Sequence, residues 1–225
     1  MNMLPCAAPF ALASSIFAQT SVVSQPAVTA DANVGFGFYS HIHARPTRNY
    51  LHADDFRLTS AATVNRVVWW GESEGVLTDD LSNFSDFGIT FYTARAASNG
   101  RPVPDQIIAT AIFPIADAQA TATGRFAPNG AAEHRFEVDL PQAVSLNANT
   151  WYFVAIGARC VSNSGDAFMW QDSDTYNGYT VSWSYQQNRW IQTQDTDSAF
   201  ELINVPAPAT LVGLLALAPL RQRRR

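Results

Sequence analysis

The sequence predicts an all-β protein built on a single antiparallel β-sandwich or jelly roll. From about residue 51, short runs with alternating apolar and polar residues follow one another, separated by turn residues such as NG, GD and SNSG. Alternation with a period of two is the pattern of a strand with one buried face. No stretch inside this region keeps a helical period of 3.6 over three turns. About ten short strands at this spacing are typical of a sandwich or jelly roll.

The run HRFEVDL shows the alternation most clearly. Phe136, Val138 and Leu140 fall on one face of the predicted strand, and Glu137 and Asp139 fall on the other. We expect the first set in the core and the second at the surface.

The tryptophans divide between core and surface in the same way. In YTVSWSY, Tyr179, Val181 and Trp183 share one apolar face, which favours burial. We therefore predict that Trp183, Trp151 and one of the Trp69/Trp70 pair lie in the core. Cys160 ends the alternating run WYFVAIGARC, and we expect a buried thiol there.

Four segments divide the chain. The apolar stretch from Leu4 to Ala18 precedes small and polar residues, which predicts a signal peptide over 1–18, with Ala30 as an alternative end. Residues 19–50 form a lead-in with one edge strand around GFGFYSHIH, residues 51–204 form the β-sandwich domain, and residues 205–225 form a separate tail.

The tail VPAPATLVGLLALAPLRQRRR begins with prolines that stop regular structure. Twelve uncharged residues follow, which predicts a short hydrophobic helix, although a full span needs about 20 apolar residues. The closing arginines, which stay on the cytoplasmic side of a membrane, are Arg221, Arg223, Arg224 and Arg225.

These features resemble the PEP-CTERM sorting signal of exported bacterial proteins. Val205, Pro206, Ala207 and Pro208 take the place of its motif, with Ala207 standing where glutamate is usual. The resemblance implies processing by an exosortase-type enzyme, a transient inner-membrane anchor, and final placement at the cell surface or in the extracellular matrix. More loosely, the runs DDFRLTSAATVNRVVWWGE and FGITFYT resemble uncharacterised β-sandwich domains found in such proteins.

Charge excludes one class of partner. Apart from the four terminal arginines, ten basic residues face 19 acidic ones. An acidic body argues against nucleic-acid binding, because that binding depends on neutralising phosphates with basic residues.

Paired aspartates suggest a cation site. QDSD and QDTD each place two carboxylates two residues apart, and Asp-Asp pairs recur at 54–55 and 79–80. Calcium takes several oxygen ligands from flexible loops, whereas aspartates are also common in turns for their own hydrogen bonds. A structural calcium ion is therefore a hypothesis, whose candidate ligands are Asp172, Asp174, Asp195 and Asp197.

Aromatic residues gather late in the chain, in DSDTYNGYTVSWSYQQNRW. Exposed rings beside Asp, Asn and Gln can stack on sugars, and Tyr176 and Trp190 are the candidate glycan contacts. Packing in the core is the alternative for this cluster.

The remaining signals are weaker. Glu72 and Glu74 share a strand face and could act as the carboxylate pair of a polysaccharide hydrolase. His41 and His43 could present two imidazoles on one strand face for a metal, with His52 nearby, but no third ligand stands at a recognisable spacing. No specific catalytic motif is present, so we predict no catalytic residues and no cofactor beyond the possible calcium ion.

Taken together, the sequence predicts an exported surface protein that binds or adheres, with weak recognition of extracellular polysaccharide as the most specific version. A polysaccharide-acting hydrolase is the alternative, and a purely structural envelope component is a further one.

Overall fold

The computed structural model of the chain describes residues 19–28, 37–42, 49–74, 81–97, 100–127, 130–161, 167–175, 179–194 and 196–206. The predicted signal peptide and the apolar and arginine-rich parts of the tail lie outside these residues. Within them the chain is nearly all strand, with one short 3-10 helix, η2 (Ile115–Asp117). No described helix is long and apolar enough to cross a membrane.

The first of two sheets is antiparallel and runs in the order β1-β14-β5-β11-β2, with β9 pairing β5 and β8 pairing β9. Its strands are β1 (Thr20–Gln25), β2 (Phe38–Tyr39), β5 (Ala62–Glu74), β8 (Thr121–Phe126), β9 (Ala132–Leu146), β11 (Ala167–Trp170) and β14 (Phe200–Asn204).

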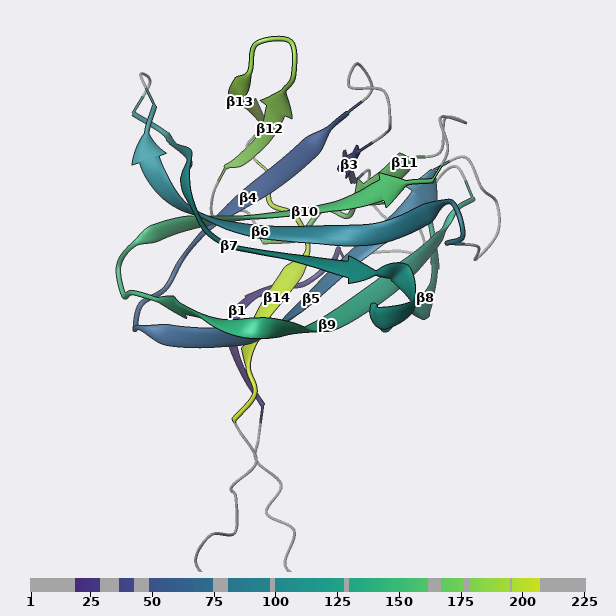
Figure 1. The fold of residues 1–225 in the computed structure, drawn as a ribbon, viewed down its shortest axis with the longest axis horizontal. Coiled ribbons are helices and arrows are strands. Elements are labelled where there is room, and N and C mark those ends of the chain that lie inside the picture. The colour runs from purple at the N-terminus through teal and green to yellow at the C-terminus, as the bar shows by residue number, and fades with distance from the viewer. Residues whose placement is uncertain are drawn as a thin grey trace, which may run out of the picture.

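The second sheet runs in the order β13-β12-β4-β10-β6-β7 and is antiparallel except where β3 pairs with β10. Its strands are β3 (His41–Ile42), β4 (Leu51–Arg57), β6 (Phe84–Ala96), β7 (Pro102–Pro114), β10 (Trp151–Cys160), β12 (Thr180–Ser184) and β13 (Arg189–Gln194). Figure 1 shows both sheets strongly curled, with β12 and β13 projecting from one end of the domain.

The main core lies between the two sheets. Trp69 of β5 stacks on Phe136 of β9 with ring centroids 5.2 Å apart, and Phe87 of β6 meets Trp69 edge-on at 5.0 Å. Phe168 of β11 contacts Phe87 at 5.0 Å. These four rings are fully buried, and offset or edge-on aromatic pairs of this kind stabilise a core beyond the area they bury.

Alternation along β9 sorts most side chains as the sequence predicts, with Leu140 half-buried against the main core. Phe136 and Val138 are buried, whereas Glu137 and Asp139 form ion pairs with Arg66 on the outer face of the neighbouring strand, each at 2.6 Å. Cys160 is buried in the main core, as expected.

A second, smaller cluster covers the opposite face of the second sheet. Phe153 and Ala155 of β10 belong to it, whereas Tyr152, Val154 and Ile156, which alternate with them, belong to the main core. Val181 of β12 is buried in this outer cluster.

Two tryptophans predicted to be core are only partly buried. Trp183 lies on the face of β12 that Val181 shares, but this is the outer face of the sheet, and its small cluster ends before Trp183. Trp151 opens β10 under the Arg57 guanidinium, 6.0 Å from its ring. Of the Trp69/Trp70 pair, Trp69 is the buried member.

The predicted lead-in is part of the domain. β1 pairs with β14 along its length, from Thr20 opposite Asn204 to Gln25 opposite Phe200. β2 lies at the edge of the same sheet, where an edge strand was expected around 35–43. The domain therefore begins about 30 residues earlier than the predicted boundary at residue 51.

At the C-terminal side, the domain contacts Val205, the first residue of the predicted sorting motif. The Asn65 side chain donates to the Val205 carbonyl at 2.6 Å and accepts from the Val205 backbone N–H at 2.7 Å. These two bonds hold Val205 to the domain.

Candidate functional site

The candidate site lies where the chain crosses between the sheets beside β4. On one side, β12 pairs with β4 only from Leu51 to Asp54. Two connections meet the strand near Asp54 and Asp55 instead: Tyr179, just before β12, and Ser198, between β13 and β14. Backbone N–H groups of both connections bind aspartate side chains of β4 at this point.

Three carboxylates converge at this edge. Asp54, Asp55 and Asp197 are each 0% exposed, and one oxygen from each lies within 4.8 Å of the others. They form the only such group of His, Cys, Asp and Glu side chains in the described part of the chain. We call Asp54, Asp55 and Asp197 the carboxylate cluster.

Backbone donors orient two of the carboxylates. The Ser198 N–H donates to Asp54 Oδ2 at 2.6 Å, and the Tyr179 N–H donates to Asp55 Oδ1 at 2.7 Å. The Gln25 amide, with its nitrogen turned toward the cluster, donates to Asp54 Oδ2 and the Ser198 carbonyl, both at 3.0 Å. Strand β1 and both connections therefore hold the cluster in place.

The other oxygens of the two β4 carboxylates have no protein donor. Asp54 Oδ1 and Asp55 Oδ2 are buried and make no hydrogen bond to any described residue. The same holds for Thr196 Oγ1 and Ser198 Oγ, on either side of Asp197 in sequence. Most buried polar atoms in proteins have a partner, so this concentration of unsatisfied oxygens marks an unusual place.

Burial dominates the electrostatics of the cluster. Desolvation raises the pKa of Asp54 well above its usual range, and the Asp197 carboxylate raises it further. Desolvation also raises the pKa of Asp55 to about 7, against the lowering effect of the Tyr179 N–H. Three negative charges cannot share this space without protons or a cation to neutralise them.

The chemistry of the cluster suits a hard cation. The unsatisfied atoms in and beside the cluster are carboxylate and hydroxyl oxygens, which are the ligands that magnesium and calcium prefer. The cluster contains no imidazole or thiolate. Oxygens that share a calcium ion at 2.3–2.6 Å lie at most about 5 Å apart, and the observed spacing falls within that limit.

The structure brings together only part of the predicted calcium set. Asp197 joins the cluster, Asp172 is half-buried with its pKa raised to about 7 by burial, and Asp174 is exposed. Asp195 lies outside the described residues. Asp172 pairs across from Ser198, and side chains in directly opposed positions share a face. Among the described members, only Asp197 joins a group of converging carboxylates, so Asp172, Asp174 and Asp197 do not form one site.

Asp54 and Asp55 were noted as a pair, but their link to Asp197 was missed. The separation of more than 140 residues hides that contact from sequence analysis. The signal that could have found them is in the run LHADDFR itself. Two adjacent charged residues inside an otherwise buried strand require a special environment, because charged side chains are rarely buried without partners.

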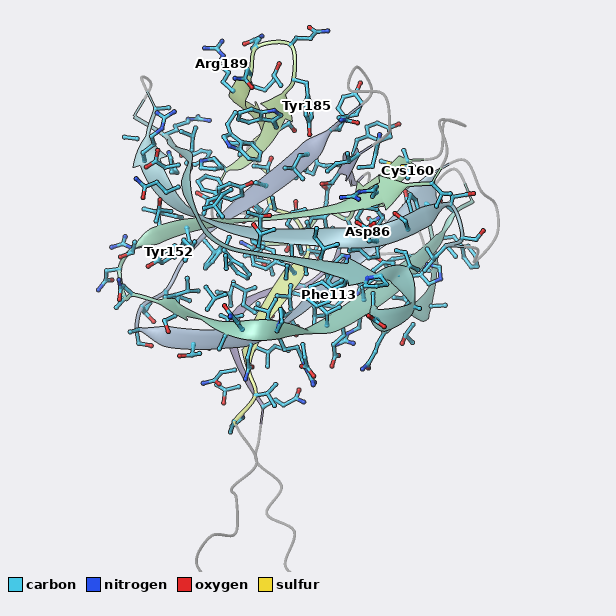
Figure 2. All side chains as sticks on the ribbon, in the orientation of Figure 1. Asp86, Phe113, Tyr152, Cys160, Tyr185 and Arg189 are labelled. Atoms are coloured by element: carbon cyan, nitrogen blue, oxygen red, sulfur yellow. The ribbon has the colours of Figure 1, made fainter. Side chains whose placement is uncertain are left out.

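Aromatic side chains form a second feature on the β12–β13 hairpin. Trp183 and Trp190 are each half-buried and meet edge-on at 5.4 Å, and Tyr185 lies 6.4 Å from Trp183 with 38% of its surface exposed. Trp190 also packs on Tyr92 of β6 at 5.6 Å. Figure 2 shows Tyr185 and Arg189 on the projecting hairpin. Of the two predicted glycan contacts, Trp190 belongs to this aromatic hairpin, and Tyr176 lies outside the described residues.

The predicted acidic pair does not form an open groove in the described structure. Glu72 is 2% exposed and lies opposite Glu133, which is fully buried and ion-paired with Arg125 at 2.6 Å. The Glu74 side chain lies outside the described atoms. Two cavities, of about 320 and 350 Å³, have no acidic residue in their lining.

The histidines occupy structural positions. His52 is fully buried, stacks on Phe38 at 4.1 Å, and its Nδ1 lies 3.1 Å from Ser182 Oγ; burial lowers its pKa to about 3. His41 is buried under Tyr39 and Tyr50. His43 lies outside the described residues.

The fold and these features define an all-β domain of two curled sheets with an acidic crossing point and an aromatic hairpin. The chain belongs to a family described as a domain of unknown function, DUF7901, whose profile matches residues 22–203. No curated protein matches it, and no solved structure does.

Proposed function

We propose that this protein is an exported, surface-sorted binding module that uses its aromatic hairpin for weak recognition of extracellular polysaccharide. The module is a β-sandwich of the jelly-roll kind and acts without catalytic turnover. Its N-terminal signal directs export. Its tail is read by an exosortase-type enzyme after a transient stay in the inner membrane, and the protein then resides at the cell surface or in the extracellular matrix.

The observation that carries this proposal is the hairpin itself. Trp183, Tyr185 and Trp190 retain exposed ring surface on an element that projects from the domain. Ring faces can stack on the apolar C–H surfaces of sugars. The tip between them, residues 185–188, is exposed and contributes two glutamines and an asparagine as hydrogen-bonding groups.

The position of the hairpin is consistent with surface display. β1 and β14 leave the domain together at one end, and the hairpin lies at the other (Figure 1). A domain attached through its C-terminal end would present the hairpin outward. The family match over residues 22–203 leaves the tail outside the shared domain, as expected for a separate sorting element.

A glycan array with the full-length protein tests the binding function. Tyr185→Ala removes the most exposed ring of the hairpin, and Trp183→Ala removes the ring that links Tyr185 to Trp190. We expect each change to weaken binding at least tenfold. Tyr50→Ala is the matched control, because Tyr50 is 49% exposed and belongs to a different aromatic cluster.

Binding of wild type and Tyr50→Ala to the same glycans, with loss in the two hairpin variants, would support the proposal. Silence on every glycan would overturn polysaccharide recognition and favour a structural envelope role. Release of reducing ends from a bound polysaccharide would contradict a binding function without turnover.

A further inference from the structure

We propose that the carboxylate cluster of Asp54, Asp55 and Asp197 binds one calcium ion at the base of the aromatic hairpin. This inference goes beyond polysaccharide recognition and does not depend on it. It rests on the geometry of the cluster and on the unsatisfied oxygens that surround it.

The first support is the placement of charge. All three carboxylates are fully buried, and one oxygen from each falls within 4.8 Å of the others. Proteins rarely bury carboxylates without a neutralising partner, because removing a charge from water is costly. A divalent cation coordinated by all three would offset that cost and remove their mutual repulsion.

A second support comes from groups outside the three carboxylates. The Ser198 side chain is fully buried and its Oγ makes no hydrogen bond to any described residue, while its own backbone N–H binds Asp54 Oδ2. Ser198 therefore contacts the cluster through its backbone, one residue from Asp197. Thr196 Oγ1 is also buried without a described partner. Calcium takes six to eight oxygens, so such neutral donors would complete a shell that three carboxylates begin.

Gln25 contacts both the cluster and a neighbouring cavity. A cavity of about 350 Å³ opens between β1, β4 and β10 and is lined by Gln25, Phe56, Arg57 and Trp151 among others. The Gln25 amide lies 3.0 Å from Asp54 Oδ2. Gln25 thus stands between this cavity and the carboxylates, and its displacement would admit a cation.

The bound ion would order the hairpin from both ends. The chain enters β12 directly after Tyr179, whose N–H binds Asp55, and it leaves β13 through the segment that carries Asp197 and Ser198. A cation that fixes Asp55 and Asp197 therefore fixes the start and the end of residues 179–198. The aromatic side chains lie inside that stretch.

Calorimetric titration of the full-length protein with calcium chloride, after dialysis against EDTA, tests the site directly. We expect one calcium ion per chain and a dissociation constant between about 10⁻⁶ and 10⁻³ M, the range of sensor and extracellular sites. At 100-fold excess over this constant, the melting temperature should rise by about 5–10 °C. Hydrogen exchange should slow in residues 179–198 more than in β5 or β9.

Two isosteric variants locate the site, and an exposed residue of the same type is the control. Asp55→Asn and Asp197→Asn retain shape and, for Asp55, the oxygen that accepts the Tyr179 N–H. We expect at least a tenfold loss of calcium affinity in each. In EDTA both should fold at least as well as wild type, since each removes a buried negative charge. Asp174→Asn changes an exposed aspartate outside the cluster and should bind calcium as wild type does.

The proposal is overturned if wild type binds no calcium, if magnesium chloride binds as tightly, or if the two variants bind calcium as well as Asp174→Asn does. These outcomes are independent of the glycan array. If the protein binds calcium but no glycan, the calcium site stands and only the proposed polysaccharide recognition fails.

Discussion

Asp172 shows how one carboxyl makes stability depend on pH without belonging to the carboxylate cluster. Burial raises its pKa from 3.8 in the unfolded chain to about 7 in the folded protein. The folded state therefore keeps a proton that the unfolded state releases. This contribution to stability is fully present below pH 4, declines as pH rises toward 7, and is absent above that value.

Asp172→Asn should remove that part of the pH dependence. We expect melting temperatures measured in EDTA to fall less steeply between pH 4 and pH 7 in this variant than in wild type. Asp174→Asn, two residues away and exposed, should follow the wild-type curve. Parallel curves for Asp172→Asn and wild type would contradict a buried, protonated Asp172.

The burial of some single residues was predictable from the sequence, and that of others was not. The alternation in HRFEVDL identified Phe136 and Val138 as core and Glu137 and Asp139 as surface, because one face of β9 meets the main core and the other meets Arg66. The same reasoning was wrong for Trp183, because a period of two identifies a shared face but not which side of the sheet the core covers. The sequence also offered no way to place Asp197 next to Asp54 and Asp55, because the fold brings these residues together across more than 140 positions.

At the scale of elements, β5 and β11 pair unusually closely around a glycine. Gly71 lies opposite Trp170, and a Cβ there would fall 2.7 Å from the Met169 carbonyl and closer still to the Phe168 ring. Glycine in a strand often permits such an approach. The packing of Phe168 among the rings of the main core leaves it little room to move.

Gly71→Ala should therefore destabilise the domain by about 1–3 kcal/mol, the usual cost of overpacking a core. Gly88→Ala on β6 is the matched control, because a Cβ there would meet nothing nearer than 3.9 Å. We expect that variant within about 0.5 kcal/mol of wild type. Urea unfolding followed by circular dichroism measures both, and equal costs would contradict the contact at Gly71.

Elements differed in how far the sequence predicted them. The strands β6, β9, β10 and β12 coincide with runs whose sequences favour strands. These runs are rich in apolar residues because at least one face of each strand is buried. β1 and β8 did not appear among the predicted runs. The segment TSVVSQ of β1 is short, mostly exposed and mixed in composition. Its strand exists because β14, far along the chain, supplies the hydrogen bonds.

At the scale of the whole molecule, the boundary between domain and tail is set by Asn65. Its side chain makes two hydrogen bonds to the backbone of Val205, the first residue of the predicted sorting motif. Composition predicts an apolar tail after the β domain, but composition alone could not show that Val205 is bonded to Asn65.

Two truncations separate the address from the fold. Deletion of residues 207–225 retains Val205 and should release the protein from membrane and surface fractions without changing its stability. Deletion of residues 205–225 should do the same and also lower the free energy of unfolding by about 1–3 kcal/mol, because two hydrogen bonds are lost. Cell fractionation and urea unfolding measure the two effects. An unchanged location after the shorter deletion would mean that the tail is not used as an address.

The pairing of β1 with β14 has a mechanical consequence. β14 is the last strand before the tail, it lies between β1 and β5, and the hairpin is at the far end of the domain (Figure 1). If flow pulls on a polysaccharide held at the hairpin while the tail is fixed, the force runs lengthwise along β14. Its hydrogen bonds to both neighbouring strands then bear the load together in shear, rather than opening one after another. The arrangement favours a tether that resists being drawn out of its domain.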